Sequence, residues 1–332
     1  MTLPTTMRAL RVSDLVPDFA GCAIEDVPVP TPGPGEVLLH VRAAALGFPD
    51  LLMTEGKYQH RPDLPFTPGT DITGEIAALG DGVTDFAVGD AVVAPLSSGG
   101  FADYVLCPAS ALRRKPENMD FASASAFGVA YLTAYVSLVR RAEIQEGEWL
   151  LVHGAAGGVG LAAVDLGKAL GARVIAASAS DEKLSIIADH YAPDATVNVS
   201  DGFRERVKEL TDGGADVIYD PVGGDIFDES TRCIAFGGRL LIVGFTSGRI
   251  ATVPTNIPLI KGFSVVGVRA GEYGRRYPER GRENLDAIWA LAESGKVKPH
   301  VHAALPLDQW REAFEMMRSR EVVGRVIIAP NG

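Results

Sequence analysis

The sequence predicts an α/β protein in which a doubly wound parallel sheet is combined with a second domain rich in β-strands. From about residue 120, six short apolar segments alternate with stretches of helical periodicity, which is the pattern of βαβ units. Before that point, short alternating segments are separated by Gly, Pro and Gly-Asp, which favours a β domain. A length of 332 residues suits two domains of roughly 150 residues each.

The first part of the chain is expected to form a small barrel-like domain. Its strands are predicted at 7–12, 36–43, 72–79, 91–94 and 102–106, and a Pro-Gly-Pro-Gly turn precedes the second of them.

A long Ala-rich helix is expected next, over 121–141, with a break near Gly128. The alternating part then begins with the apolar run at Leu150. Further strands are predicted at 173–177, 196–199, 216–219, 239–244 and 264–268, and helices at 181–190, 203–210 and 226–235.

The last part of the chain returns to mixed character. Amphipathic helices are predicted at 284–294 and 308–319, with Asp308 as a cap, and a strand at 322–328. We therefore expect the domain with alternating strands and helices to span 124–267 and to be inserted into a β-rich domain formed by 1–123 and 268–332.

The stretch Leu150–Gly160 reads L-L-V-H-G-A-A-G-G-V-G and joins a strand to a helix. This arrangement aims backbone N–H groups at a phosphate, whereas an ordinary tight turn is the alternative. Gly154 is expected to permit the turn, Gly157 and Gly158 to let the backbone approach a pyrophosphate, and Gly160 to allow close packing. The predicted contacts in this loop are Gly154, Ala156, Gly157, Gly158, Val159 and Gly160.

The end of the following strand indicates which dinucleotide binds. A carboxylate there would hold the ribose 2′-OH of NAD, but the strand ends in Ala-Ala-Ser-Ala-Ser. Ser178 and Ser180 can donate to an extra phosphate, and Lys183 lies one turn further on, which favours NADP(H). Asp181 and Glu182 fit the first turn of a helix, where they complement its dipole. A solvated surface charge is the alternative for Lys183.

The composition excludes several classes of protein. A formal charge of -11 argues against binding nucleic acid or an anionic membrane. We expect no apolar stretch long enough to span a bilayer and no signal peptide. The three cysteines, Cys22, Cys107 and Cys233, are odd in number and widely spaced, which favours a reducing cytoplasm.

Short motifs occur in a recognisable order along nearly the whole chain. They are Gly35-Glu36-Val37-Leu38, Pro68-Gly69-Thr70-Asp71-Ile72-Thr73-Gly74-Glu75-Ile76, Gly89-Asp90-Ala91-Val92, Gly99-Gly100-Phe101-Ala102-Asp103-Tyr104, Leu132-Thr133-Ala134-Tyr135, the glycine loop, Tyr219-Asp220-Pro221-Val222-Gly223-Gly224 and Gly237-Gly238-Arg239. In this order they resemble the medium-chain dehydrogenase/reductase superfamily, in its zinc-independent NADPH:quinone oxidoreductase branch. The resemblance implies a GroES-like catalytic domain, completed by the C-terminal segment, and a central Rossmann domain.

The same resemblance bears on metal binding. Zinc-dependent relatives have a cysteine at the position of Gly47 and a His-Glu pair at Thr70-Asp71. An isolated aspartate cannot build a tetrahedral zinc site, and only Cys107 remains of the expected four-cysteine lobe. We expect His300 and His302 to be surface or structural residues, and we predict no metal.

Without a Lewis acid, quinones and conjugated alkenes are the easier hydride acceptors, because the product is a stabilised phenolate or enolate. The resemblance places residues 47–50 beside the nicotinamide, where Gly47 and Leu52 replace the asparagine and tyrosine of many relatives. Tyr58 and Asp50 are the candidate catalytic residues. The alternatives are a loop aromatic that covers the cleft for Tyr58 and a structural role for Asp50.

The resemblance also implies contacts on the nicotinamide side. They are Thr133, Phe245, Thr246 and Ser247, together with Val268 through its backbone. The alternatives are helix packing for Thr133 and a simple polar turn for 246–248.

The sequence thus predicts an NADPH-dependent reductase of a quinone or a similar conjugated carbonyl compound. An enoyl-thioester or enone reductase and a non-catalytic NADPH-binding protein remain alternatives. The substrate is expected to be a small molecule. The resemblance implies a homodimer, for which the strands at 239–244 and 263–268 offer a sheet edge.

Overall fold

The computed structural model describes residues 3–59, 61–96 and 98–331, and the chain divides into two compact units. Unit 1 comprises the chain up to Val129 and again from Pro299, and unit 2 is Ala130–Lys298. The predicted boundaries assigned 268–298 to the catalytic domain, whereas these residues group with unit 2. The reason is local: the helices in this stretch contact each other, and Arg140 bonds to Glu283 and Asn284.

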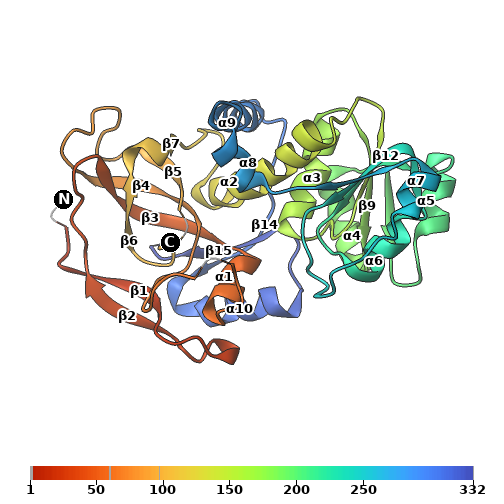
Figure 1. The fold of residues 1–332 in the computed structure, drawn as a ribbon. Coiled ribbons are helices and arrows are strands. Elements are labelled where there is room, and N and C mark those ends of the chain that lie inside the picture. Colours follow the sequence, from red (N-terminus) through yellow and green to blue (C-terminus); the bar gives the residue numbers. More distant parts are fainter. Residues whose placement is uncertain (1–2, 60, 97, 332) are drawn as a thin grey trace. The chain divides into compact units, whose positions relative to one another are not determined.

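Unit 1 is built on a mainly antiparallel sheet of seven strands, in the order β14-β15-β3-β4-β5-β7, with β6 also paired to β3 (Figure 1). The strands are β3 (Glu36–Leu46), β4 (Asp71–Leu79), β5 (Ala91–Pro95), β6 (Tyr104–Pro108), β7 (Arg113–Arg114), β14 (Val301–Pro306) and β15 (Arg325–Ala329), and β1 (Thr6–Val12) and β2 (Cys22–Pro28) form a separate antiparallel pair. The five strands predicted for the first part of the chain are present. Because β3 pairs with β4, β6 and β15, residues at the end of the chain complete a sheet that begins near its start.

Two helices contact each other in unit 1, namely α1 (Phe48–Thr54), which was not predicted, and α10 (Trp310–Ser319). The prediction that Asp308 caps the second helix is wrong. A 3₁₀ turn at Leu307–Gln309 comes first and no side chain caps α10, while the Asp308 carboxylate lies 3.4 Å from Arg8.

Unit 2 contains a six-stranded sheet in the order β10-β9-β8-β11-β12-β13, with all neighbours parallel. The strands are β8 (Trp149–Val152), β9 (Arg173–Ser178), β10 (Ala195–Asn198), β11 (Ala215–Asp220), β12 (Ile234–Ile242) and β13 (Ser264–Gly267). The predicted doubly wound sheet is confirmed. The apolar sequence of β13 predicted a buried strand. In the structure β13 is an edge strand, and its residues are exposed or partly exposed.

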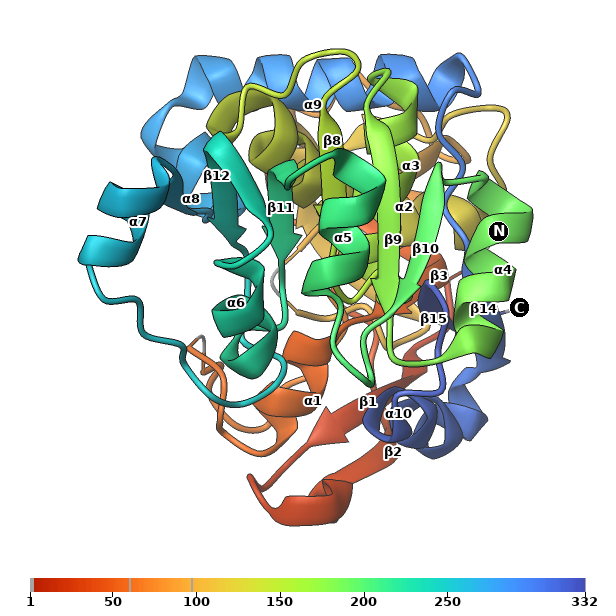
Figure 2. The ribbon, with the colours of Figure 1, turned by 90° about the vertical axis from the view of Figure 1, so that its right-hand side faces the viewer.

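Helices cover both faces of this sheet (Figure 2). They are α3 (Gly158–Ala169), α4 (Asp181–Tyr191), α5 (Arg204–Thr211) and α6 (Gly224–Ser230). The helices α5 and α6 share one apolar core with Leu151 and Ile175 of the strands. The helices α3 and α4 contact each other. Gly167 of α3 lies against Leu150 and Val174, which point to the face of the sheet opposite that of Leu151 and Ile175. The predicted helix at 226–235 is shorter, because the chain already enters β12 at Ile234.

The long Ala-rich helix is continuous where a break was predicted. The helix α2 (Phe121–Tyr135) passes through Gly128 and continues as a π-helical segment, Val136–Arg141. Gly128 serves close packing instead, because a Cβ there would lie 3.3 Å from the Asp71 carboxylate. The remaining helices are α7 (Asn256–Lys261), α8 (Ala270–Arg276) and α9 (Pro278–Glu293).

The combined helix Phe121–Arg141 has 21 residues and a mean hydropathy of 1.4. By length and composition alone it is sufficient to cross a membrane, so the expectation that no stretch reaches that length is wrong. Its most apolar window is 56% buried inside the structure, and a core helix of this kind meets the same two criteria.

Candidate functional site

The glycine loop lies between β8 and α3, as its sequence predicted. Gly154 has a φ of +56°, a left-handed conformation that favours glycine. A Cβ on Gly160 would lie 2.2 Å from the Gly154 carbonyl oxygen, so the first turn of α3 closes against the loop. At Gly157 a Cβ would meet that oxygen at 3.4 Å, an ordinary contact, so packing alone does not require glycine there.

The loop presents the N-terminus of α3. Gly157 is the N-cap of this helix, and no side chain caps it. Its carbonyl accepts the N–H of Leu161 at 2.8 Å, which leaves the N–H groups of the first turn outside the helical pattern. A helix N-terminus of this kind attracts anions. The N–H of Gly157 already donates to the Gly154 carbonyl at 2.9 Å, and the predicted phosphate contacts from Ala156 to Gly160 stay predictions.

The end of β9 lies next to this loop, since the N–H of Ala155 donates to the Ala177 carbonyl at 3.1 Å. Beyond it, the Ser180 hydroxyl caps α4 by accepting the Lys183 N–H at 3.3 Å. The next residue, Asp181, carries a carboxylate that accepts a hydrogen bond from Asn198 at the end of β10.

A turn after β11 forms a third part of the site. The buried Asp220 carboxylate accepts the N–H groups of Val222 and Gly223 at 2.8 and 2.9 Å. Burial raises the pKa of this carboxyl, and the two N–H donors oppose the rise. Sequence reasoning had assigned Asp220 only to a family motif, although a lone acid at the end of an apolar strand is a signal for a role of this kind.

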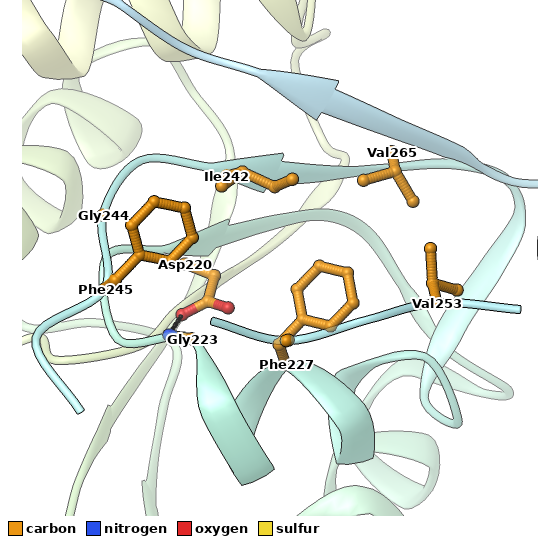
Figure 3. Close-up of a pocket in the computed structure, with 9 residues that line it drawn as sticks. Asp220, Gly223, Phe227, Ile242, Gly244, Phe245, Val253 and Val265 are labelled. Carbon is orange, nitrogen blue, oxygen red and sulfur yellow. Dashed lines mark hydrogen bonds between the residues drawn. The ribbon is translucent and has the colours of Figure 1, made fainter. Parts of the chain in front are cut away.

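A small cavity of about 70 Å³ lies beside this turn. Figure 3 shows the Asp220 carboxylate between the rings of Phe227 and Phe245. The rest of its lining is Gly223, Ile242, Gly244, Ala251, Val253 and Val265. Its walls are mostly apolar, and its volume is far below that of a dinucleotide.

The predicted nicotinamide-side residues follow β12 and β13. Thr246 and Ser247 donate their N–H groups to the carbonyls of Pro221 and Val222, at 3.1 and 3.0 Å. Phe245 is 47% exposed, and the N–H of Val268 donates to the Ile242 carbonyl. The loops after β8, β11 and β12 thus come together at one end of the sheet, where ligands of doubly wound folds bind.

Thr133 lies in α2 within unit 2, and its carbonyl accepts the Ser137 hydroxyl at 2.6 Å. Its predicted contact with the nicotinamide stays a prediction.

The second candidate region is in unit 1, where Asp50 is fully buried in the first turn of α1. One carboxylate oxygen accepts the N–H of Gly47 at 2.8 Å and the other that of Gly69 at 2.9 Å. Burial raises the pKa of Asp50 to about 6, although the two N–H groups and nearby Arg325 oppose this. Asp50 therefore fixes the loops at 47–50 and 69–71. Its predicted catalytic role stays a prediction.

Asp71 lies beside it and forms a buried ion pair. The Arg325 guanidinium donates to one carboxylate oxygen at 2.9 Å, and the N–H of Val129 donates to the other at 3.3 Å. Burial raises the pKa of Asp71, and Arg325 opposes that rise. Arg325 was missed by sequence reasoning, although a lone arginine in the apolar strand at 322–328 was a usable signal.

These residues do not fit a zinc ion. Gly47 offers no side chain, and the Asp71 carboxylate already binds Arg325 and a backbone N–H. Within the described ranges, no group of three His, Cys, Asp or Glu side chains could hold a metal ion. Of His300 and His302, the second accepts the Val323 N–H at 3.4 Å through Nδ1.

The second catalytic candidate, Tyr58, lies in the loop after α1. Its ring is partly buried and packs against the apolar core of unit 1. This packing does not decide between a proton donor and a loop aromatic that covers the cleft, so both stay predictions.

Comparison with known proteins agrees with both units. Residues 33–117 match the family described as alcohol dehydrogenase GroES-like domain, and residues 158–289 match the family described as zinc-binding dehydrogenase.

Relatives and solved structures cover nearly the whole chain. The chain is 40% identical to a quinone oxidoreductase-like protein 2 homolog of Nematostella vectensis, over 89% of this chain and 82% of that protein. It is 30% identical to human quinone oxidoreductase over 97% of each chain. A probable oxidoreductase from Mycobacterium abscessus superposes with a TM-score of 0.89 and 32% identity, covering 99% of this chain and 100% of that one.

The quinone oxidoreductase from Thermus thermophilus, whose structures include a complex with NADPH, superposes with a TM-score of 0.83 and 29% identity. The match covers 97% of this chain and 100% of that one. The fold and these matches define an oxidoreductase. The chain belongs to the medium-chain dehydrogenase/reductase superfamily, in its quinone oxidoreductase-like branch.

Proposed function

We propose that this protein is an NADPH-dependent, zinc-independent reductase of quinones or similar conjugated carbonyl compounds. The observation that carries the proposal is the end of β9. This strand ends at Ser178 without an acid, directly beside a glycine loop that presents the uncapped N-terminus of α3. The structural relative from Thermus thermophilus, which binds NADPH, supports the choice of cofactor.

The residues of unit 2 fit the dinucleotide. The N–H groups at the start of α3 would hold the pyrophosphate, and Ser178 and Ser180 would donate to the 2′-phosphate, which a carboxylate at their positions would repel. The loop Phe245–Ser247 would flank the nicotinamide. When bound, NADPH supplies the hydride.

The choice of acceptor follows from the residues of unit 1. Since these residues do not fit zinc, the acceptor has to stabilise the added negative charge itself, as a quinone or an α,β-unsaturated carbonyl compound does. The Tyr58 hydroxyl or a water molecule would then deliver the proton. The quinone oxidoreductases among the relatives support the first of these acceptors.

An anaerobic assay with NADPH tests the acceptor. We expect turnover with a panel of quinones, and larger kcat/KM values than with acyl-thioester alkenes of matched concentration. Higher rates with the thioester alkenes would make the protein an enoyl reductase. Tight NADPH binding without reduction of either class would make it a binding protein.

The 2′-phosphate contact can be tested separately. In Lys183→Ala we expect NADPH to bind more weakly and NADH to be unaffected, because only NADPH carries the extra phosphate. Ser178→Asp should lower the NADPH/NADH affinity ratio further, since it places an acid at the end of β9. If neither variant changes this ratio in isothermal titration, the assignment of the 2′-phosphate site is wrong.

We further propose that the protein forms a homodimer through the edge of the unit 2 sheet. In the described part of the chain, β13 pairs with β12 on one side and its other side lies at the sheet edge. Nearby apolar side chains are highly exposed: Phe236 by 88%, Leu259 by 81% and Ile260 by 74%. A second copy would continue the sheet and cover them. Light scattering should give a dimer for the native chain and a monomer for Leu259→Asp, and a native monomer would refute the proposal.

A reducing compartment, as in the cytoplasm, is the setting we propose. Its support is that Cys22, Cys107 and Cys233 are all buried free thiols. Cell fractionation with an antibody against this protein would test it, and recovery from an oxidising compartment would contradict it.

A further inference from the structure

The chain passes between the two units at two places, which have one neighbour in common. It enters unit 2 within α2, between Val129 and Ala130, and leaves it between Lys298 and Pro299. Although the whole of unit 2 separates these crossings in sequence, both lie beside a single carboxylate, that of Asp165 on α3.

The contacts converge on one oxygen atom. The hydroxyl of Tyr131, which is one residue beyond the first crossing, donates to Asp165 Oδ2 at 2.5 Å. The backbone N–H of Lys298, at the second crossing, donates to the same oxygen at 2.7 Å. The Tyr191 hydroxyl donates to the carbonyl of Lys298 at 2.6 Å, so this residue is held through both of its backbone polar groups.

Burial of the Asp165 carboxylate opposes folding, because a charged group loses its hydration. Asp165 is 8% exposed, and Tyr131 is 2% exposed. Burial raises the pKa of Asp165 to about 6, while its bonds to Tyr131 and Lys298 oppose the rise. Around it, α3 otherwise buries apolar or small residues such as Ala163, Val164 and Leu166.

The helix that carries Asp165 also carries the glycine loop. Asp165 lies seven residues after Gly158, the first residue of α3, or roughly 10 Å along the helix axis. One rigid element therefore presents the predicted phosphate site at its start and holds both crossings about two turns later.

We propose that Asp165 is a positioning residue that ties the two crossings into a single hinge. Because both donors share one acceptor on α3, the two connecting segments keep a common reference on one helix, and loosening one of them also loosens the other. The hinge goes beyond the proposed reaction and does not depend on which cofactor or acceptor binds.

Hydrogen–deuterium exchange of the ligand-free protein tests the hinge directly. The key variant is Tyr131→Phe, which removes one hydroxyl at the first crossing. We expect exchange to rise roughly tenfold at residues 130–135 and also at 296–298, because the shared acceptor is disturbed and a bond to a charged group is lost. Faster exchange at 130–135 alone would overturn the proposal, since the crossings would then be independent.

Two further variants complete the experiment. Asp165→Asn keeps an acceptor oxygen and should raise exchange at both crossings less than Asp165→Ala does, and equal effects would count against the shared acceptor. The matched control is Asp194→Asn, because Asp194 also accepts a backbone N–H, that of Val174, and the Lys168 ammonium. Asp194→Asn should leave exchange at both crossings unchanged, and a rise there would overturn the assignment.

The functional readout separates a hinge from general stability. For Tyr131→Phe we expect kcat to fall severalfold with the NADPH dissociation constant within about twofold of the native value, since α3 still presents its N-terminus. Unchanged kcat together with loosened crossings would show that the contacts are structural only. If no acceptor is reduced even by the native protein, the proposed function fails, whereas the exchange data still decide on the hinge.

Discussion

The glycine loop of unit 2 and the cluster around Asp50, Asp71 and Arg325 in unit 1 hold their segments by different means. In the loop, backbone meets backbone: Gly157 donates to Gly154, and Gly160 lies against the same carbonyl. In the cluster, buried charged side chains bind N–H groups and one another, and Arg325 reaches Asp71 across 254 positions of the sequence. The loop is therefore local and uncharged, whereas the cluster is long-range and charged.

This difference has energetic consequences. Because the contacts among Gly154, Gly157 and Gly160 involve backbone alone, they are sensitive to added volume and do not themselves titrate. A cluster of two acids and one arginine is sensitive to the loss of either sign of charge, because the remaining charge stays buried without compensation. Variants that remove a charge from the cluster or add a methyl group to the loop test this difference.

The largest effect is expected for Arg325→Met. It leaves Asp71 and Asp50 buried without their cation, so we expect unit 1 to lose about 3–5 kcal/mol of stability in urea unfolding. The double variant Arg325→Met/Asp71→Asn should recover part of this loss, because it also removes the uncompensated charge. Equal urea midpoints for the native protein and the single variant would contradict the buried ion pair.

A pH-dependent effect is expected at Asp50. Its pKa is about 6 in the folded protein and 3.8 ordinarily, so between these values the folded state binds more protons than the unfolded state. Its contribution to stability therefore decreases as pH rises from 4 to 6, by roughly 3 kcal/mol, and stays low above pH 6.

The variant Asp50→Asn cannot ionise, so the stability difference between the native protein and this variant should fall over the same pH range. Urea unfolding at pH 4.5, 6 and 7.5 measures this difference. Parallel stability curves for the two proteins would show that Asp50 does not titrate there.

In the loop, Gly160→Ala should cost about 1–3 kcal/mol, because the new methyl group meets the Gly154 carbonyl at 2.2 Å. Its control is Gly157→Ala, where the nearest atom is 3.4 Å away and φ is −77°. We expect Gly157→Ala to fold with native stability and to bind NADPH at least tenfold more weakly, since the added methyl group would stand where a phosphate approaches. Native affinity in this variant would place the phosphate elsewhere.

The smallest effect is expected for Ser180→Ala, which removes the N-cap of α4. Loss of a cap of this kind costs about 1 kcal/mol, to be read from thermal unfolding. Ser180→Asp retains the cap and should restore stability while weakening NADPH binding. A loss of stability in both variants would indicate that the hydroxyl, rather than capping as such, is needed.

The fold was largely predictable because its signals are local. Alternating apolar segments and helical periodicity identified the six parallel strands and most helices of unit 2, and the glycine loop stands at its predicted place. The errors lie where tertiary contacts or short elements determine the local structure. Gly128 did not break α2, because it packs against the carboxylate of Asp71. The helix α1 was missed because it has seven residues and begins with Phe48-Pro49.

The candidate site was predictable only in part, for the same reason. The glycines and the missing acid at the end of β9 are visible in consecutive residues. The pairing of Asp71 with Arg325, and of Tyr131 with Asp165, joins residues distant in sequence, and no periodicity connects them. A polar residue in an apolar segment indicates that its position is unusual. It does not indicate which distant residue binds it.

The central strand of unit 1 also affects how the protein is made. The strand β3 emerges early from the ribosome, whereas its neighbour β15 is synthesised only after the whole of unit 2. Unit 2 is continuous in sequence and can therefore fold first, while the apolar edge of β3 at Ala44–Leu46 waits unpaired. Nascent chains halted before Arg325 should hence hold a protease-resistant unit 2 and a protease-sensitive unit 1, a state in which a chaperone that shields exposed strands would raise the yield.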